Sequence, residues 1–159
     1  MHTHVKATIM NGFRGKSQHT LDPKGRLIIP SRFRSVVKAS REEALMITIF
    51  DGALHAYTME EWDTLETKMR HARGKYMGRA KRLILGSAMP CTLDKQGRIQ
   101  IPKELREYAG IEPDGGVVLL GLVERFEIWQ SAKLQKEQQA IEADLKTDDA
   151  REELMEFGF

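Results

Sequence analysis

Residues 20–34 read TLDPKGRLIIPSRFR and residues 92–106 read TLDKQGRIQIPKELR, so one fifteen-residue segment occurs twice in the chain. Eight of the fifteen positions are identical, and each position of the first copy returns 72 residues later. Both copies follow the pattern L-D-x-x-G-R-L/I-x-I-P-x-x-x-R. A repeat of this kind indicates two copies of one structural unit.

The first half of the repeat has the composition of a tight turn. In the first copy, Asp22 can accept hydrogen bonds from backbone N–H groups two residues ahead, and Gly25 can adopt the positive φ that closes the turn. Arg26 follows the turn directly, where a long side chain can project. We assign the Asp and the Gly to turn architecture. Their equivalents in the second copy are Asp94, Gly97 and Arg98.

A longer unit surrounds each turn. A short amphipathic helix is predicted over 30–38, followed by strands over 45–50 and 54–57 that are joined by the hairpin turn Asp51-Gly52. The second copy has matching strands over 117–122 and 126–129, at the same offset. The repeated unit is therefore a strand, a turn, a strand, a short helix and a hairpin. One such unit of about 50 residues has too few strands to bury its own apolar faces.

A helix is predicted after each unit. Thr58 and Glu61 form a capping box, and the first helix is expected to continue through Gly74 and Gly78 as far as Leu85, connecting the halves. Ser131 is expected to cap the second helix. Apolar side chains recur at helical spacing on both, at Trp62, Leu65, Met69, Ala72 and Tyr76 and at Leu134, Ile141 and Leu145.

The duplicated pattern resembles the tandem DNA-binding domains of the MraZ family, bacterial transcriptional regulators of the AbrB/SpoVT type. The resemblance runs from Phe13-Arg14-Gly15 to about Trp129. It implies a mixed fold, mainly β with flanking helices, in which the two repeats form a pseudo-two-fold swapped-hairpin β-barrel. The expected divisions are a first repeat over 13–60, a helical connector over 61–86, a second repeat over 87–130, and a C-terminal helix with an acidic tail over 131–159.

The resemblance also implies that Arg26 and Arg98 contact DNA. A guanidinium group pairs with phosphate oxygens or with guanine edges. The alternative is that each arginine only forms a salt bridge with the aspartate of its own turn. The second copy is less basic, since Gln96 replaces Lys24 and two glutamates follow, so we expect the halves to contribute unequally. Further candidates for DNA contact around the first copy are Arg14, Lys16, Lys24, Arg32 and Arg34.

The net charge of the 159-residue chain is only +2, but the charges are unevenly distributed. Eight Lys and Arg face one acid between positions 14 and 41, and seven face none between 68 and 82. From position 137 onward, eight acids face two bases. Such segregation indicates a charged partner or a neighbouring subunit, the alternative being ordinary solvated faces.

Other classes of protein are disfavoured. No apolar run is long enough to span a membrane and no signal peptide opens the chain, so we expect a cytoplasmic, nucleoid-associated protein. Cys91 has no catalytic context and is interpreted as a small buried hydrophobe. His2 and His4 lack a third metal ligand, and 5–10 could be a strand or a flexible arm. We expect no enzyme activity, cofactor, metal or small-molecule substrate.

Three functional hypotheses follow. The first is a sequence-specific transcriptional regulator that binds double-stranded DNA. The family resemblance adds direct repeats in the promoter of the cell-division and cell-wall gene cluster as its target, and a ring-shaped homo-oligomer larger than a dimer as its assembly. The second is an antitoxin-like module that uses the same barrel to hold a partner protein. An enzyme is the third.

Overall fold

A computed structural model describes residues 12–159. The chain alternates strands and helices, and each predicted hairpin is present. The strands are β1 (Phe13–Thr20), β2 (Arg26–Ile28), β3 (Ala44–Phe50), β4 (Ala53–Thr58), β5 (Met89–Thr92), β6 (Arg98–Gln100), β7 (Gly116–Val123) and β8 (Arg125–Gln130). The helices are α2 (Ser31–Lys38), α3 (Met59–His71), α4 (Lys75–Ser87), α5 (Lys103–Ala109), α6 (Ser131–Asp144) and α7 (Asp148–Glu156).

The two repeats exchange strands. Six strands form one antiparallel sheet in the order β1-β7-β8-β4-β3-β5, and β2 and β6 form a separate two-stranded ribbon. Strand β1 of the first unit pairs with β7 of the second, while β5 of the second pairs with β3 of the first. The mixed fold and the exchange between repeats are confirmed, but the expectation of a mainly β fold is wrong, because more of the described residues lie in helices than in strands. The closed barrel is not confirmed, because the hydrogen-bonded sheet is open, with β1 and β5 at its edges.

The strand registers follow a two-fold axis. Leu27 lies opposite Ile99 in the ribbon, and His55 lies opposite Glu127 between β4 and β8. Each of these pairs consists of the same repeat position in the two copies, so the pseudo-dyad passes between its members. The β1–β7 register likewise maps onto the β5–β3 register, with Thr20 opposite Gly116 and Thr92 opposite Ala44.

The core lies between the sheet and the ribbon, and both repeats contribute to it. Phe13, Phe33 and Phe126 are buried and pack against one another with ring centroids 4.9 to 5.3 Å apart. Leu27 and Ile99, from the ribbon, belong to the same cluster. Cys91 is buried there as predicted, and burial raises the pKa of its thiol to about 11.

The helices that follow each unit differ in part from the prediction. The Thr58 hydroxyl accepts a hydrogen bond from the Glu61 N–H at 3.2 Å, which confirms the predicted cap. The expected continuous connector is wrong, because α3 ends at His71 and α4 begins after Gly74, whose φ of +136° interrupts the helix. The cap of α6 is the Gln130 side chain rather than Ser131, because β8 extends to Gln130.

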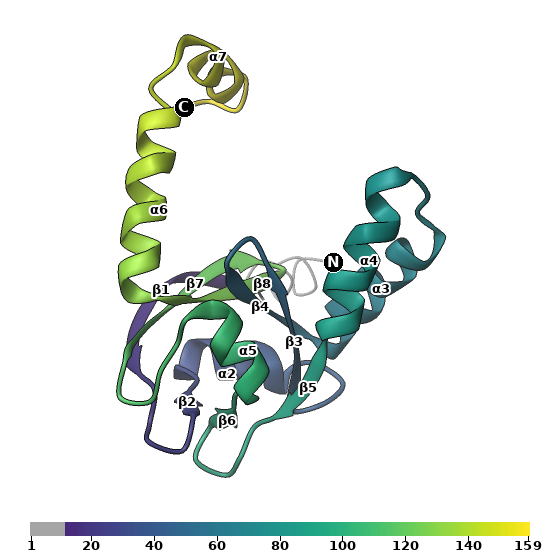
Figure 1. The fold of residues 1–159 in the computed structure, drawn as a ribbon, viewed down its shortest axis with the longest axis vertical. Helices are drawn as coiled ribbons and strands as arrows, with labels where there is room; N and C mark the ends of the chain where they lie inside the picture. The colour runs from purple at the N-terminus through teal and green to yellow at the C-terminus, as the bar shows by residue number, and fades with distance from the viewer. Residues whose placement is uncertain (1–11) are drawn as a thin grey trace, which may run out of the picture.

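Figure 1 shows how these parts are arranged. The sheet and ribbon form the body, with the turns before β2 and β6 at the bottom of the view. The α3–α4 pair projects at the upper right, while α6 rises at the upper left and carries α7 at its far end. The turns and the helical arms therefore occupy opposite ends of the molecule.

Residues 12–159 contain neither a membrane-spanning helix nor a metal-binding cluster. No helix within 12–159 is long and apolar enough to cross a membrane. Over the same residues, no group of three or more His, Cys, Asp or Glu side chains is placed to hold a metal ion. His2, His4 and the possible strand over 5–10 lie outside the described residues.

Candidate nucleic-acid interface

The two repeated turns have the same hydrogen bonds. In the first, Asp22 Oδ1 accepts from the backbone N–H groups of Lys24 and Arg26 at 2.9 and 2.8 Å, and Oδ2 accepts from Arg26 Nε at 2.6 Å. In the second, Asp94 accepts from the N–H groups of Gln96 and Arg98 and from Arg98 Nε, each at 2.9 Å. Both aspartates therefore accept three hydrogen bonds each within their own turns.

These contacts keep both carboxylates ionised. Desolvation acts to raise the pKa of Asp22, but hydrogen bonds from the Arg26 backbone and guanidinium and from the Lys24 backbone outweigh it, and the pKa is lowered. The pKa of Asp94 is lowered chiefly by the hydrogen bond from the Arg98 backbone, against the opposing effect of desolvation. At neutral pH each turn therefore presents a fixed negative charge to its own arginine.

The salt bridges use only part of each guanidinium group. Arg26 and Arg98 donate through Nε to their aspartates, and within 12–159 their terminal Nη nitrogens have no hydrogen-bond partner. Each arginine thus does form the salt bridge with the aspartate of its own turn. This salt bridge still leaves the two terminal nitrogens of each guanidinium group able to bind a partner. Their side chains are 30% and 23% exposed.

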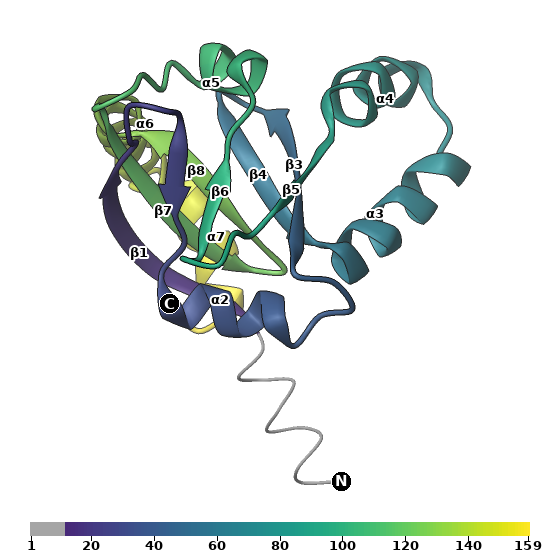
Figure 2. The ribbon, with the colours of Figure 1, turned by 90° about the horizontal axis from the view of Figure 1, so that it is seen from below.

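The ribbon has a buried and an exposed face. Leu27 and Ile99 face the core, so the alternation of a strand places the neighbouring side chains on the outer face. Arg26 and Arg98 are diagonal neighbours there, with a general spacing of about 7–8 Å between such Cα atoms. The other outer residues are Ile28 and Gln100. Seen from below in Figure 2, the ribbon lies between α2 and α5.

Each turn packs against the helix of the other repeat. A Cβ on Gly97 would lie 2.6 Å from Arg34 Cδ, and a Cβ on Gly25 would lie 2.9 Å from Arg106 Cζ. The Ile29 N–H donates to Gly97 O at 2.9 Å, and the Ile101 N–H donates to Gly25 O at 3.0 Å. Both glycines also have positive φ. At each position, the backbone conformation and the close packing of the arginine therefore both favour glycine.

This exchange redistributes the basic charge. A cavity of about 300 Å³ lies beside the second turn and is lined by residues of both repeats, with the cations Arg34 and Lys38 from α2 and Lys95 from the turn, and the acids Glu43 and Asp94. The helix beside the first turn is instead α5, which carries Glu104 and Glu107. The repeat with the more basic sequence therefore places its helix beside the turn of the other repeat, which sequence order alone does not indicate.

The sequence matches known proteins along most of its length. A family model described as "MraZ protein, putative antitoxin-like" matches residues 13–80 and 84–155. This chain belongs to the MraZ family. The transcriptional regulator MraZ of Desulforapulum autotrophicum is 43% identical over 146 residues, covering 92% of this chain and 99% of the relative. Those of Desulfosudis oleivorans and Ligilactobacillus salivarius are 44% and 40% identical, covering 92% and 91% of this chain and 99% and 98% of the relatives.

The remaining predicted cations of this MraZ family member lie in three places. Lys24 is exposed at the first turn. Arg32 donates through Nε to Arg14 O at 3.3 Å and through Nη2 to Lys16 O at 2.6 Å, which gathers three cations along β1 and the start of α2. Arg34 is partly buried and donates through Nη1 to Ile29 O at 2.7 Å. Its contacts support the second turn.

Four side chains near the turns were missed by the sequence reasoning. Arg106 supports the first turn, and Gln100 Nε2 donates to Lys24 O at 2.7 Å, which also holds that turn. Arg106 occupies the repeat position of Arg34, so the repeat itself contained the signal. Lys38 and Lys95 line the cavity beside the second turn, and finding them required the strand exchange.

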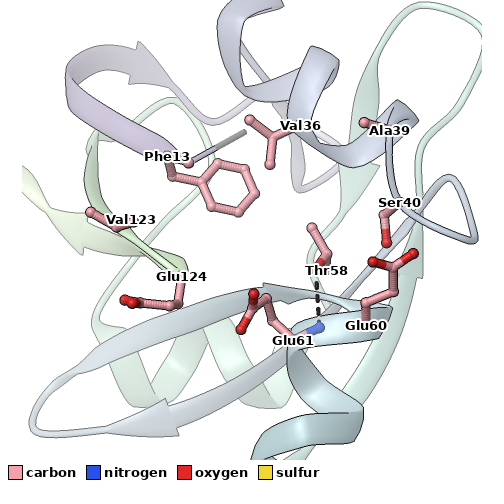
Figure 3. Close-up of a pocket in the computed structure, with 10 residues that line it drawn as sticks. Phe13, Val36, Ala39, Ser40, Thr58, Glu60, Glu61, Val123 and Glu124 are labelled. Atoms are coloured by element: carbon pink, nitrogen blue, oxygen red, sulfur yellow. Dashed lines mark hydrogen bonds between the residues drawn. The ribbon is translucent and has the colours of Figure 1, made fainter. Parts of the chain in front are cut away.

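A second cavity, also of about 300 Å³, has the opposite character (Figure 3). It lies between the start of β1, the end of α2 and the start of α3, with Phe13 and Val36 on its apolar side. Glu60, Glu61 and Glu124 surround it. Three carboxylates repel phosphate, so this cavity in the MraZ fold is not a nucleic-acid site.

The pseudo-dyad also passes through a buried polar pair on the sheet. His55 Nε2 lies 3.4 Å from Glu127 Oε2, and Glu127 Oε1 accepts a hydrogen bond from Trp129 Nε1 at 2.9 Å. Desolvation lowers the pKa of His55, against the opposing effect of the Glu127 charge. His55 is therefore neutral at pH 7, and it lies on the sheet rather than at the turns.

Proposed function

We propose that this protein is a transcriptional regulator that binds double-stranded DNA through the β2–β6 ribbon and its two turns. One observation carries the proposal. Each turn fixes its arginine through Nε, and no group within residues 12–159 binds the terminal nitrogens of the guanidinium on the outer face of the ribbon; this occurs twice about a two-fold axis. The curated relatives are named transcriptional regulators, which supports the same conclusion.

The ribbon suits the major groove of DNA in size and chemistry. That groove is about 12 Å wide and admits a two-stranded β-ribbon. The diagonal spacing of Arg26 and Arg98, about 7–8 Å, corresponds to roughly two base-pair steps of 3.4 Å. An arginine held by a carboxylate loses little conformational entropy when it forms a bidentate pair with guanine. The two turns can therefore read two nearby base pairs from one groove.

Cations around the ribbon would contact the phosphates. Three exposed lysines surround the ribbon, namely Lys24 at the first turn, Lys95 at the second and Lys38 on α2. We assign them to phosphate contacts rather than to base reading. Arg14, Lys16 and Arg32 extend the positive surface along β1. We assign Arg34 to support of the second turn, where its backbone contact and its packing on Gly97 place it. In this proposal the two repeats, 13–60 and 87–130, act as one DNA-binding body.

One protomer offers a small footprint, and single small modules bind DNA weakly at physiological salt. Linking protomers makes later contacts effectively intramolecular and raises avidity by about 10² to 10⁴ when the spacing of sites matches that of the modules. Subunits arranged head to tail present the same surface in the same sense, which suits direct repeats. The protein is accordingly a homo-oligomer larger than a dimer, with tandem promoter sites as its target.

The two helical arms supply the surfaces for this assembly. The segment 61–86 forms the basic arm, where α4 carries four cations and no acid and Tyr76 is 77% exposed. The segment 131–159 forms the acidic arm, where α7 carries five acids and Met155 and Phe157 are exposed. The arms are complementary in charge, and both lie away from the turns (Figure 1). Docking of one protomer's α7 on its neighbour's α4 would leave the ribbons free.

The family resemblance supplies the genes. We assign the cell-division and cell-wall cluster that contains the regulator's own gene as the target, and the cytoplasmic nucleoid as the place of action. Footprinting of the DNA upstream of the coding sequence tests this directly. Protection of evenly spaced direct repeats is the expected result. A uniform, sequence-independent protection pattern would contradict it.

Salt dependence tests the assigned residues. Arg26→Ala and Arg98→Ala should each weaken binding, and each should reduce the slope of log affinity against log salt by about 0.9 if the contact is to phosphate. Arg41→Ala is the matched control, because it removes the same charge from a guanidinium that Asp63 and Glu42 already bind. Unchanged affinity and slope in both ribbon variants would reject the interface.

A protein-interaction module is the second candidate. The exposed apolar residues at the end of the acidic arm favour it, with Phe157 and Phe159 81% and 86% exposed. Copurification of a different protein in fixed ratio, without salt-dependent binding to the upstream DNA, would support this function over the regulator. Removal of residues 146–159 separates the two further. In the regulator it should lower the oligomer size and the preference for tandem sites, while binding to a single site persists.

A further inference from the structure

The outer face of the ribbon is not symmetric, although its backbone is. Its four side chains form two rows, Arg26 opposite Gln100 and Ile28 opposite Arg98. The pseudo-dyad exchanges the two arginines with each other, but it exchanges Ile28 with Gln100. The two halves of the ribbon therefore present an arginine with different neighbours.

Ile28 is a large apolar side chain that is 52% exposed on this otherwise polar face. A single exposed apolar residue needs no explanation by itself. Here its counterpart is used within the protein, because Gln100 Nε2 donates to Lys24 O and holds the first turn. Isoleucine has no donor and cannot make the equivalent bond to the second turn. Its side chain is left facing the space that the proposed DNA would fill.

The major groove contains one apolar group that a side chain can recognise, the C5-methyl of thymine. Residues directly opposite in an antiparallel pair have Cβ atoms about 4.5–5.5 Å apart, which lies between one and two base-pair steps of 3.4 Å. A guanidinium that reads guanine therefore has an opposite neighbour within reach of the same or the adjacent base pair. For Arg98 that neighbour is apolar, and for Arg26 it is an amide.

We propose that Ile28 is a specificity-determining residue that contacts a thymine methyl beside the base read by Arg98. This inference rests on the proposed DNA-binding function. It also gives each protomer a direction on DNA, because only one half of the ribbon carries the apolar contact. A symmetric ribbon would read both orientations of a site alike, whereas this ribbon distinguishes them. Directional reading is what tandem direct repeats require of each subunit.

Replacement of thymine by deoxyuridine, which lacks only the methyl group, tests the contact. In a duplex carrying the footprinted upstream site, each thymine is replaced in turn and the affinity of the full-length protein is measured. At one position, the replacement should lower the affinity of the wild-type protein about fourfold, which is equivalent to about 0.8 kcal/mol for one buried methyl group. Ile28→Ala should bind more weakly but should no longer respond at that position, and Ile28→Val should keep most of the response.

The double exchange Ile28→Gln with Gln100→Ile provides a second measurement. It should move the uracil-sensitive thymine to the other half of the site. The inference is overturned if the wild-type protein binds the site and no single thymine-to-uracil replacement lowers its affinity. It is also overturned if such a replacement lowers the affinity of Ile28→Ala as much as that of the wild-type protein. Absence of any salt-dependent DNA binding by the wild-type protein would instead reject the proposed function and this inference together.

Discussion

The two turns of the repeat have nearly the same backbone but different surroundings. The first is flanked by α5 with its glutamates, and the second by α2 with Arg34 and Lys38. Read along the chain, the first copy is the more basic one, yet the strand exchange moves its helix to the second turn. The surroundings of a repeated motif in an exchanged fold are therefore set by the other copy, so local composition is a poor guide to which half binds more strongly.

The largest expected effect comes from separating the halves. A chain ending at Gly78 retains β1 and β4 but loses their partners β7 and β8. Its apolar strands cannot be covered, and we expect no folded monomer. Circular dichroism and thermal melting at several concentrations measure this. A sharp, concentration-independent melting transition in residues 1–78 would show that the exchange is dispensable.

Alanine at Gly97 tests the support of one turn by the other repeat. The backbone there has φ of +75° and a Cβ would lie 2.6 Å from Arg34 Cδ, so Gly97→Ala should lower the free energy of unfolding by about 1–3 kcal/mol. In the double variant with Arg34→Ala, the part of the stability loss that comes from the clash with Arg34 should disappear. The part that comes from backbone strain at position 97 should remain. Additive losses in the denaturant titrations of the single and double variants would mean that the two residues do not interact.

Comparison of Arg26→Ala with Arg98→Ala decides between local composition and exchanged surroundings. Each loss should cost about 1–3 kcal/mol of DNA-binding free energy if the arginine reads a base. The sequence alone predicts a smaller effect for Arg98, whereas the basic helix α2 beside the second turn predicts an effect at least equal to that of Arg26. Titrations of both variants on one duplex at fixed salt rank the two halves. A clearly weaker effect at Arg98 would favour the local composition.

The smallest effect concerns the one buried polar pair on the pseudo-dyad, His55 and Glu127. Burial lowers the pKa of His55 in the folded protein below the ordinary histidine pKa of about 6.5, which applies in the unfolded chain. As the pH falls through 6.5, His55 therefore binds a proton more readily in the unfolded chain than in the folded protein. Stability should fall as the pH drops from about 6.5 toward the lowered pKa. His55→Gln should remove this part of the pH dependence, measured by urea unfolding at pH 7.5 and 5.5. An identical loss in the variant would assign the acid sensitivity to other groups.

Local features were predictable because they depend on neighbouring residues. Asp22 and Gly25 specify the turn, and Thr58 specifies the start of α3, by contacts within four positions along the chain. Contacts between the repeats were not predictable in this way. The packing of Arg34 on Gly97 brings together residues that are far apart in sequence, and no local pattern encodes it.

The main errors arose where two local signals competed. The apolar spacing of the connector favoured one long helix, but Ala72 is extended and ends α3, and Gly74, with its positive φ, precedes α4. Ser131 and Gln130 can both cap a helix, and the extra residue of β8 leaves Gln130 in the extended conformation of a cap. Strand exchange was expected only from the family resemblance. The resemblance also implied a closed barrel, but no hydrogen bonds join the two edge strands of the sheet, β1 and β5.

The pairing of β1 with β7 also has a consequence for synthesis of the protein on the ribosome. Phe13 at the start of β1 lies opposite Val123 at the end of β7, so the first strand remains without its partner until most of the chain has been made. The second hairpin begins 72 residues after the first, at Gly116 rather than Ala44, and at about 5–20 residues per second this length takes roughly 4–14 s to translate. During that interval the apolar strands of the first repeat are uncovered beside those of neighbouring nascent chains. Chaperone binding in this window, and pairing between two chains, compete directly with correct folding.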